Sequence, residues 1–309
     1  NLSEENKKRL REINSEMAVA TLKYGQNILA ETNSYELVIS DKNDLAGLPN
    51  ELIETASADA KAKGKAGKWV FTLSNSSVMP FLQYSSNRKL RKEIWNAYQM
   101  RANNGNDKDN KSLAIKIANL RGEKARLLGY ATHADYVLEK SMAKNPETAN
   151  KLLNDLWIPA LNMANKEAAD IQKMMQKEGI NEPVQPYDWR YYTEKIRKER
   201  FDLDEQEMKP YFSLEKTREG VFTVCKNLYG LQFKQLNNVP KYHEDVTVWE
   251  VTEANGSHVG ILYMDFHPRT SKRGGAWMTS YRTQKTQPGK RVAPVVSIVS
   301  NSTKPTENA

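Results

Sequence analysis

Apolar residues recur at helical spacing through the first two thirds of the chain. The first series alternates steps of three and four residues: Leu10, Ile13, Met17, Ala20 and Tyr24. It predicts a helix from residue 3 to about 32, with Ser3 as its N-cap. The seam is too short for a free-standing coiled coil, so we expect packing between antiparallel helices.

The same period predicts further helices, most of them bounded by start or stop residues. One helix is predicted after Leu48-Pro49 and another from Thr132. The others are predicted at 87–101, 113–127, 146–175, 187–200 and 214–228. Asn145-Pro146-Glu147 is a strong start signal, with a capping Asn and a first-turn Pro. Pro159 lacks an amide hydrogen, which predicts a kink or break. Glu123 lies between Arg121 and Arg126, which indicates pairing within the helix or a buried ion pair.

The period changes to two in the last third of the chain. Apolar and polar residues alternate from Val246, Asn255-Gly256 favours a hairpin turn, and residues 258–266 read as a strand covered on both faces. Pro294 cannot donate to a strand ladder, so that end of the last run is expected at an edge or a bulge. The predicted fold class is mainly α with a small antiparallel or mixed β-sheet near the C-terminus (α+β).

Two regions follow from this change of pattern. Residues 1–182 are predicted to be helical, and residues 187–309 to hold helices followed by the small sheet. The intervening Glu182-Pro183-Val184-Gln185-Pro186 is the best linker candidate in the chain.

Composition excludes some classes of protein and leaves others open. No run of 18 apolar residues occurs, so no membrane span is expected, and the single Cys225 provides no disulfide framework. The 46 Lys and Arg against 38 Asp and Glu give a net charge of +8. That excess, with the basic runs at 61–68 and 194–200, suggests an alternative as a basic helical nucleic-acid-binding or scaffold protein. The second run includes acids and neither has a stacking-aromatic motif, which argues against nucleic acid.

The histidines do not form a zinc-peptidase pattern. That chemistry needs two imidazoles one helical turn apart, a third ligand and a carboxylate base, but no two of the four histidines lie at i, i+4. His243-Glu244-Asp245 reads as a polar turn, and His258 and His267 are able to approach one another on a strand. We expect no metal site and no catalytic residue in this chain, and nothing supports a Cys–His nucleophile pair.

Four stretches of sequence nevertheless resemble a known family. They are 71–110, 120–143, 189–212 and 263–306; the last contains Tyr263-Met264-Asp265-Phe266 and Gly274-Gly275-Ala276-Trp277-Met278. In this order they resemble the thimet oligopeptidase and peptidyl-dipeptidase family of zinc metallopeptidases. The Gly-Gly-Ala-Trp-Met form is most similar to the bacterial peptidyl-dipeptidase branch.

The resemblance implies a zincin-like, two-lobed helical peptidase that removes C-terminal dipeptides from short peptides. In the family, the zinc-binding H-E-x-x-H helix follows shortly after the last stretch, whereas this sequence reaches Ala309 without it. We therefore expect an internal fragment in which both regions belong to one larger, incomplete peptidase domain. Zinc and peptide substrates would belong to the parent protein, together with the missing C-terminal half as partner. The chain alone is expected to be inactive; a catalytically dead regulator is a further alternative. Localisation stays open between the cytoplasm and export.

One segment is a candidate for contact with substrate: Gly274, Gly275, Ala276 and Trp277. Two glycines let another backbone approach closely, and a strand edge pairs with an extended peptide. The alternative is a tight bend required for packing. Lys272-Arg273 beside it either attracts a peptide carboxylate or is simply solvated.

Overall fold

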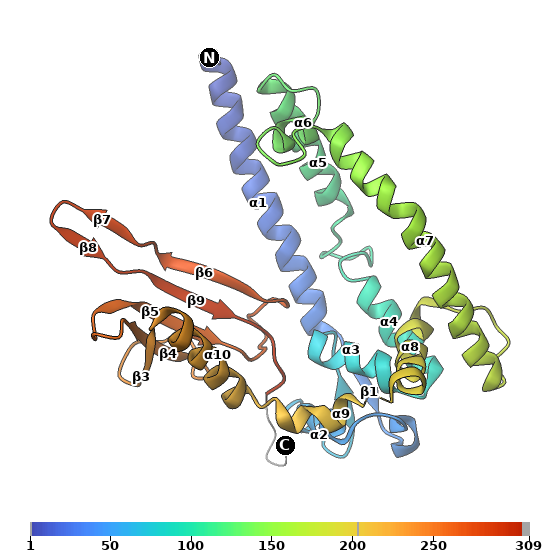
Figure 1. Ribbon diagram of the computed structural model, residues 1–309. Helices are drawn as coiled ribbons and strands as arrows, with labels where there is room; N and C mark the ends of the chain where they lie inside the picture. Colours follow the sequence, from blue (N-terminus) through green and yellow to red (C-terminus); the bar gives the residue numbers. More distant parts are fainter. Residues whose placement is uncertain (1, 203, 305–309) are drawn as a thin grey trace. The chain divides into compact units, whose positions relative to one another are not determined.

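The computed structural model describes residues 2–202 and 204–304, so residues 305 and 306 of the last family-like stretch lie outside it. The elements are helical up to Tyr229, apart from two short strands, and extended afterwards (Figure 1). The helices are α1 Glu4–Ser34, η1 Lys42–Leu45, α2 Asn50–Ala62, α3 Asn75–Tyr84, α4 Arg88–Gln99, α5 Lys111–Leu127, α6 His133–Leu138, α7 Pro146–Lys177, α8 Pro186–Phe201, α9 Glu205–Met208, η2 Lys209–Tyr211 and α10 Leu214–Tyr229. The strands are β1 Leu37–Ile39, β2 Trp69–Phe71, β3 Gln232–Leu236, β4 Thr247–Thr252, β5 His258–Asp265, β6 Trp277–Arg282, β7 Lys285–Gln287, β8 Lys290–Val292 and β9 Val295–Val299. The α+β class predicted from the sequence is confirmed.

The chain divides into two compact units. The first contains the residues up to Gly47, Val70–Leu73 and Phe81–Ile196; the second contains Leu48–Trp69, Ser74–Pro80 and the chain from Arg197 onwards. The proposed linker at 182–186 connects α7 to α8 inside the first unit. Among the described residues, none of the helices combines the length with the hydrophobicity of a membrane span.

In the first unit, α1 and α5 pack side by side in opposite directions (Figure 1). Arg9 near the start of α1 donates from Nε to Glu123 Oε1 near the end of α5 at 2.7 Å. Asn27 near the end of α1 donates to Asn110 at the start of α5 at 2.9 Å, and both side chains are buried. The predicted antiparallel packing is confirmed. The main partner of Glu123 differs from the prediction, because the neighbouring helix brings Arg9 to it; Arg126 of the same helix contributes a weaker electrostatic attraction that also lowers the pKa of Glu123.

Helix α7 is covered at one end only. Ile171 and Met175 are buried against Tyr192 of α8, whereas every residue from 150 to 163 is exposed. The exposed stretch carries Leu152, Leu153, Leu156, Trp157, Ile158, Leu161 and Met163. The helix continues through Pro159, so a break is wrong, whereas a kink stays a prediction. Because this part is exposed, water can hydrate the carbonyl that Pro159 leaves without a donor.

In the second unit, five strands form a mixed sheet in the order β3-β4-β5-β9-β6. Its pairs are antiparallel except β5 with β9, which run parallel from Ile261↔Val295 to Asp265↔Val299. Strand β9 therefore lies inside the sheet, and the expected edge position for the end near Pro294 is wrong. The expected bulge is present there, since the pairing of β6 with β9 shifts between Ser280 and Arg282. Gly260 in the neighbouring strand has no Cβ, and this leaves room for Pro294. A Cβ at Gly260 would lie only 2.9 Å from Pro294.

Helix α10 covers one face of this sheet. Phe222 of α10 stacks on Phe233 of β3 at 4.1 Å between ring centroids and meets the Trp249 ring of β4 at 4.8 Å. Leu262 and Met264 complete this core. Strand alternation places Tyr263 and Asp265 on the opposite face, together with Val248, Ser297 and Val299, which are buried.

Candidate functional site

Strand β6 forms an edge of the sheet. It pairs with β9 on one side, and within the described residues no strand pairs with its other side. An edge strand presents unpaired N–H and C=O groups, which form a template for a further extended chain. The edge is six residues long, Trp277–Arg282.

The predicted segment leads into this edge: Gly274, Gly275 and Ala276 form the approach, and Trp277 is the first residue of β6. Gly275 has φ +108°, in the region that favours glycine. Asn301 fixes the approach by donating from Nδ2 to the carbonyls of Arg273 at 3.1 Å and Gly275 at 2.7 Å. The geometry thus fits both readings of the glycines: a bend held in place, directly before an open strand edge.

A buried carboxylate, Asp265 at the end of β5, organises the loop between β5 and β6. Arg269 donates to both of its oxygens at 2.9 Å, Lys272 Nζ donates to Oδ1 at 2.9 Å, and the Tyr242 hydroxyl donates to Oδ2 at 3.1 Å. Burial by itself would raise the pKa of Asp265, but the bonds from Arg269 and Lys272 outweigh it and hold the pKa below its usual value. The carboxylate is therefore charged at neutral pH and fixes the loop.

Lys272 is not available to a ligand. Its side chain is 2 % exposed, and Nζ also donates to the backbone carbonyls of Asp265 and His267. Both expectations for this lysine, a peptide carboxylate or bulk water, are wrong, because Asp265 lies within its reach. Arg273, in contrast, lies over the Trp277 ring at 4.8 Å.

The face of the sheet opposite α10 carries a row of tyrosines beside this edge. Tyr242 and Tyr263 stack at 6.3 Å between centroids, and Tyr281 of β6 meets Tyr263 edge-on at 6.2 Å. Burial raises the pKa of Tyr242, and the charge of Asp265 raises it further, so this phenol stays protonated and donates. Tyr281 is more than half exposed. Side chains of a chain lying along β6 would meet this aromatic row.

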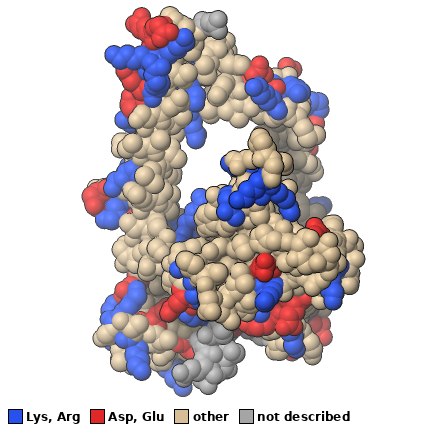
Figure 2. Space-filling model, turned by 90° about the vertical axis from the view of Figure 1, so that its left-hand side faces the viewer, with Lys and Arg blue, Asp and Glu red and all other residues tan. Residues whose placement is uncertain are grey.

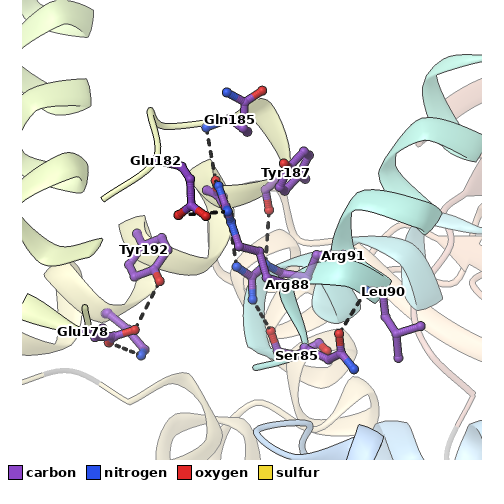
Figure 3. A network of polar contacts seen from close by, with 12 residues as sticks. Ser85, Arg88, Leu90, Arg91, Glu178, Glu182, Gln185, Tyr187 and Tyr192 are labelled. Atoms are coloured by element: carbon purple, nitrogen blue, oxygen red, sulfur yellow. Dashed lines mark hydrogen bonds and ion pairs between the residues drawn. The ribbon is translucent and has the colours of Figure 1, made fainter. Parts of the chain in front are cut away.

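A second buried carboxylate, Asp188 in the first turn of α8, lies in the first unit. Arg88 of α4 donates to it from Nε at 3.0 Å and from Nη2 at 2.9 Å, and Arg91 donates from Nη2 at 3.1 Å. Arg91 also donates to the Ser85 carbonyl at 2.7 Å (Figure 3). Burial again opposes ionisation, yet the bonds from Arg88 and the Gln185 amide leave the pKa of Asp188 lowered. Since Asp188 and Arg91 are almost fully buried, this cluster holds α4 to α8 and offers no site.

The sequence matches known peptidases over nearly its whole length. A family model described as Peptidase family M3 matches residues 81–309. The chain belongs to peptidase family M3. It is 35% identical over 305 residues to the dipeptidyl carboxypeptidase of Escherichia coli. This alignment covers 98% of this chain and 44% of that protein. It is 32% identical over 318 residues to organellar oligopeptidase A of Arabidopsis thaliana (98% and 40%), and 29% identical over 327 residues to saccharolysin of Saccharomyces cerevisiae (99% and 44%).

The M3 assignment confirms the resemblance found in the sequence. The chain spans less than half the length of these curated relatives. The four segments that carry the resemblance lie in both units, and Gly274-Gly275-Ala276-Trp277 lies inside the matched range.

The M3 family implies zinc, and the described residues do not fit it. Within residues 2–202 and 204–304, no three His, Cys, Asp or Glu side chains gather as a metal site would require. His258 pairs with Glu250 at 2.9 Å, and His267 Nδ1 lies 3.3 Å from the Ser302 carbonyl, so the two do not share a site. No chemical step of a peptidase is therefore assigned to this chain.

Three positioning residues lay outside the sequence predictions: Asp265, Asn301 and Asp188. Asp265 and Asn301 stood within the family-like stretches, but neither carried a local signal of its role. A carboxylate that follows an apolar strand, with two cations within seven residues, is a usable signal for the Asp265 cluster.

Proposed function

We propose that this chain is part of an M3 peptidase that acts on short peptides, and that it contributes the wall on which an extended peptide lies. The observation that carries this proposal is the one-sided pairing of β6 directly after the Gly274-Gly275 bend held by Asn301. A peptide added along Trp277–Arg282 would satisfy the open backbone groups of β6, as in other cases of β-strand addition.

The release of C-terminal dipeptides is the reaction we propose for the whole peptidase. It is supported by the similarity to the dipeptidyl carboxypeptidase of Escherichia coli over 98% of this chain. Zinc, when bound by the whole peptidase, would polarise the peptide carbonyl and activate water. The residues of this chain would only bind and orient the peptide, so the chain by itself is proposed to be inactive.

The proposed binding role is tested by modifying the peptide rather than by substituting residues of the protein. Two fluorescent octapeptides are compared, each N-methylated at alternate residues, one in odd and one in even positions. Strand addition uses the amides of alternate residues, so one methylated peptide should lose binding and the other should keep it. Equal binding of both, or no binding of the unmethylated parent peptide, overturns the proposed role.

A separate assay addresses inactivity. We expect no dipeptide release from the purified chain and no stoichiometric zinc by elemental analysis. Zinc at one equivalent together with turnover would contradict the proposal.

A further inference from the structure

The net positive charge of the chain comes from one segment. Residues 266–304 contain eight Lys and Arg and no Asp or Glu. Since the chain has 46 basic and 38 acidic residues, the rest of it holds 38 of each and is neutral. This segment covers β6, β7, β8 and β9, together with the loop that leads into β6.

Three of these eight cations are neutralised by carboxylates. Arg269 and Lys272 bind Asp265, and Lys304 pairs with Asp245 at 2.7 Å. The other five, which we call the basic strip, form no ion pair with any carboxylate of residues 2–202 and 204–304. They are Arg273, Arg282, Lys285, Lys290 and Arg291.

The basic strip follows the open edge from one end to the other. Arg273 lies over Trp277, the first residue of β6, and Arg282 is its last residue. The β7–β8 hairpin comes next, and its register pairs Lys290 with Gln287, which places Lys285 and Lys290 on one face. Figure 2, which views the molecule from the side where the hairpin projects in Figure 1, shows Lys and Arg side chains gathered there without acidic ones among them.

We infer that the basic strip makes the β6 edge selective for peptides that carry Asp or Glu. This inference rests on the proposed function. Six extended residues span about 20 Å, so side chains at both ends of a peptide along β6 reach cations, and an overhanging residue reaches the hairpin. Arginine and lysine attract the acidic peptide and repel a basic one, so both effects contribute to the selectivity.

Charges on an edge strand also protect proteins from edge-to-edge aggregation. That purpose requires charges on an edge strand. Three members of the basic strip, Lys285, Lys290 and Arg291, lie beyond β6 on the hairpin. Since β7 and β8 are the edges of their own two-stranded sheet, protection from aggregation would also place charges there, and the hairpin variant below separates the two roles.

The test measures the binding of matched peptides to the complete 309-residue chain by fluorescence anisotropy. One octapeptide carries two Glu near its ends, a second has Gln there, and a third has Lys. We expect the Glu peptide to bind on the order of tenfold more tightly than the Gln peptide at low salt, because two exposed ion pairs supply about a few-fold each. The preference should nearly vanish at about 1 M salt, where the Debye length is about 3 Å.

A pair of variants locates the effect. Lys285→Gln with Lys290→Gln should reduce the Glu-over-Gln preference about threefold and leave the affinity for the Gln peptide unchanged. Lys61→Gln with Lys68→Gln removes the same charge from exposed positions at and beyond the end of α2, and serves as the matched control. If both double variants lower the preference equally, only net charge matters and the inference is wrong.

The remaining outcomes separate the inference from the proposed function. Equal binding of the Glu and Gln peptides, with the alternate N-methyl pattern preserved, overturns the inference and leaves the proposed function standing. Failure of every peptide to bind overturns the proposed function and the inference with it. Binding of a single-stranded oligonucleotide as tight as that of the Glu peptide, or aggregation of the hairpin variant without loss of preference, also overturns the inference.

Discussion

Two buried aspartates, Asp188 and Asp265, use the same chemistry for different purposes. Each is almost fully buried, each is held by two cations, and the pKa of each is lowered. They differ in how far along the chain their partners lie. Arg88 and Arg91 are 100 and 97 residues from Asp188, whereas Arg269 and Lys272 are 4 and 7 residues from Asp265.

Sequence separation decides what such a cluster does. The Asp188 cluster closes a long loop and joins α4 to α8, so its loss should lower the stability of the first unit. The Asp265 cluster involves a short loop and should set the shape of the approach to β6 more than the stability of the sheet. A buried carboxylate bound by two cations thus joins two helices in the first unit and shapes a single loop in the second.

The largest expected effect is on stability, from Asp188→Asn. It leaves Arg91, with 1 % of its side chain exposed, without its charged partner. Removing one member of a buried pair costs about 3–5 kcal/mol, so we expect a loss of that size in the free energy of unfolding of the first unit. Urea unfolding followed by amide exchange in α4 and α8 measures it.

Glu182→Gln is the matched control, because it removes the exposed partner of Arg88 at 3.5 Å. Its cost should be below about 1 kcal/mol, as for other surface pairs. Equal losses from both variants would show that burial of the pair does not matter.

A smaller loss is expected from Asp265→Asn, about 2 kcal/mol, since Lys272 keeps two carbonyl acceptors. The informative readout is local: amide exchange at residues 266–276 should accelerate while α10 and β4 keep their protection. Weaker peptide binding should accompany it. Asp155→Asn, which breaks an exposed ion pair with Lys151 on α7, is the control and should leave that loop unchanged.

Lowering the pH should reduce the free energy of unfolding through both aspartates. The pKa of Asp188 and of Asp265 is lowered in the folded chain, so the unfolded state binds more protons as the pH falls below about 4. The stabilisation is present above that pH and is lost as the pH falls through the folded pKa. Each carboxyl contributes at most about 1.4 kcal/mol per pH unit.

Chemical denaturation between pH 5 and pH 2.5 checks this prediction. The slope of unfolding free energy against pH should be shallower in Asp188→Asn for the first unit and in Asp265→Asn for the second. A slope unchanged in both variants would mean that neither aspartate titrates with folding.

Features set by neighbouring residues could be read from the sequence. Ser3, Thr132 and Asn145 are helix starts predicted from the sequence, and each accepts a hydrogen bond from the backbone amide three residues on. Gly230 has the left-handed conformation expected after a helix. Capping depends on four or five consecutive residues, so the chain around it decides little.

Features that depend on distant segments could not be read in this way. The parallel insertion of β9 between β5 and β6 needs the whole crossover, and the hydrogen bonds of Asn301 depend on where that strand ends. The apolar stripe of α7 predicted its helix but not that residues 150–163 would be exposed. Of the candidate site, the segment Gly274–Trp277 was proposed from the sequence and stays a prediction, whereas the carboxylate that shapes its loop had no local signal.

The smallest expected effect concerns the bend itself. Gly275→Ala places a Cβ where no atom lies within 4 Å, so its cost comes only from φ +108° and should be about 1 kcal/mol. Gly274→Ala has no positive φ but puts a Cβ 3.3 Å from Asn75 Nδ2, so the two variants separate backbone strain from contact. If the bend positions β6 for a ligand, Gly275→Ala should weaken peptide binding by more than its cost in stability explains. If instead both variants change stability alone, the glycines serve packing, and the Asp265 cluster shapes a loop without a role in binding.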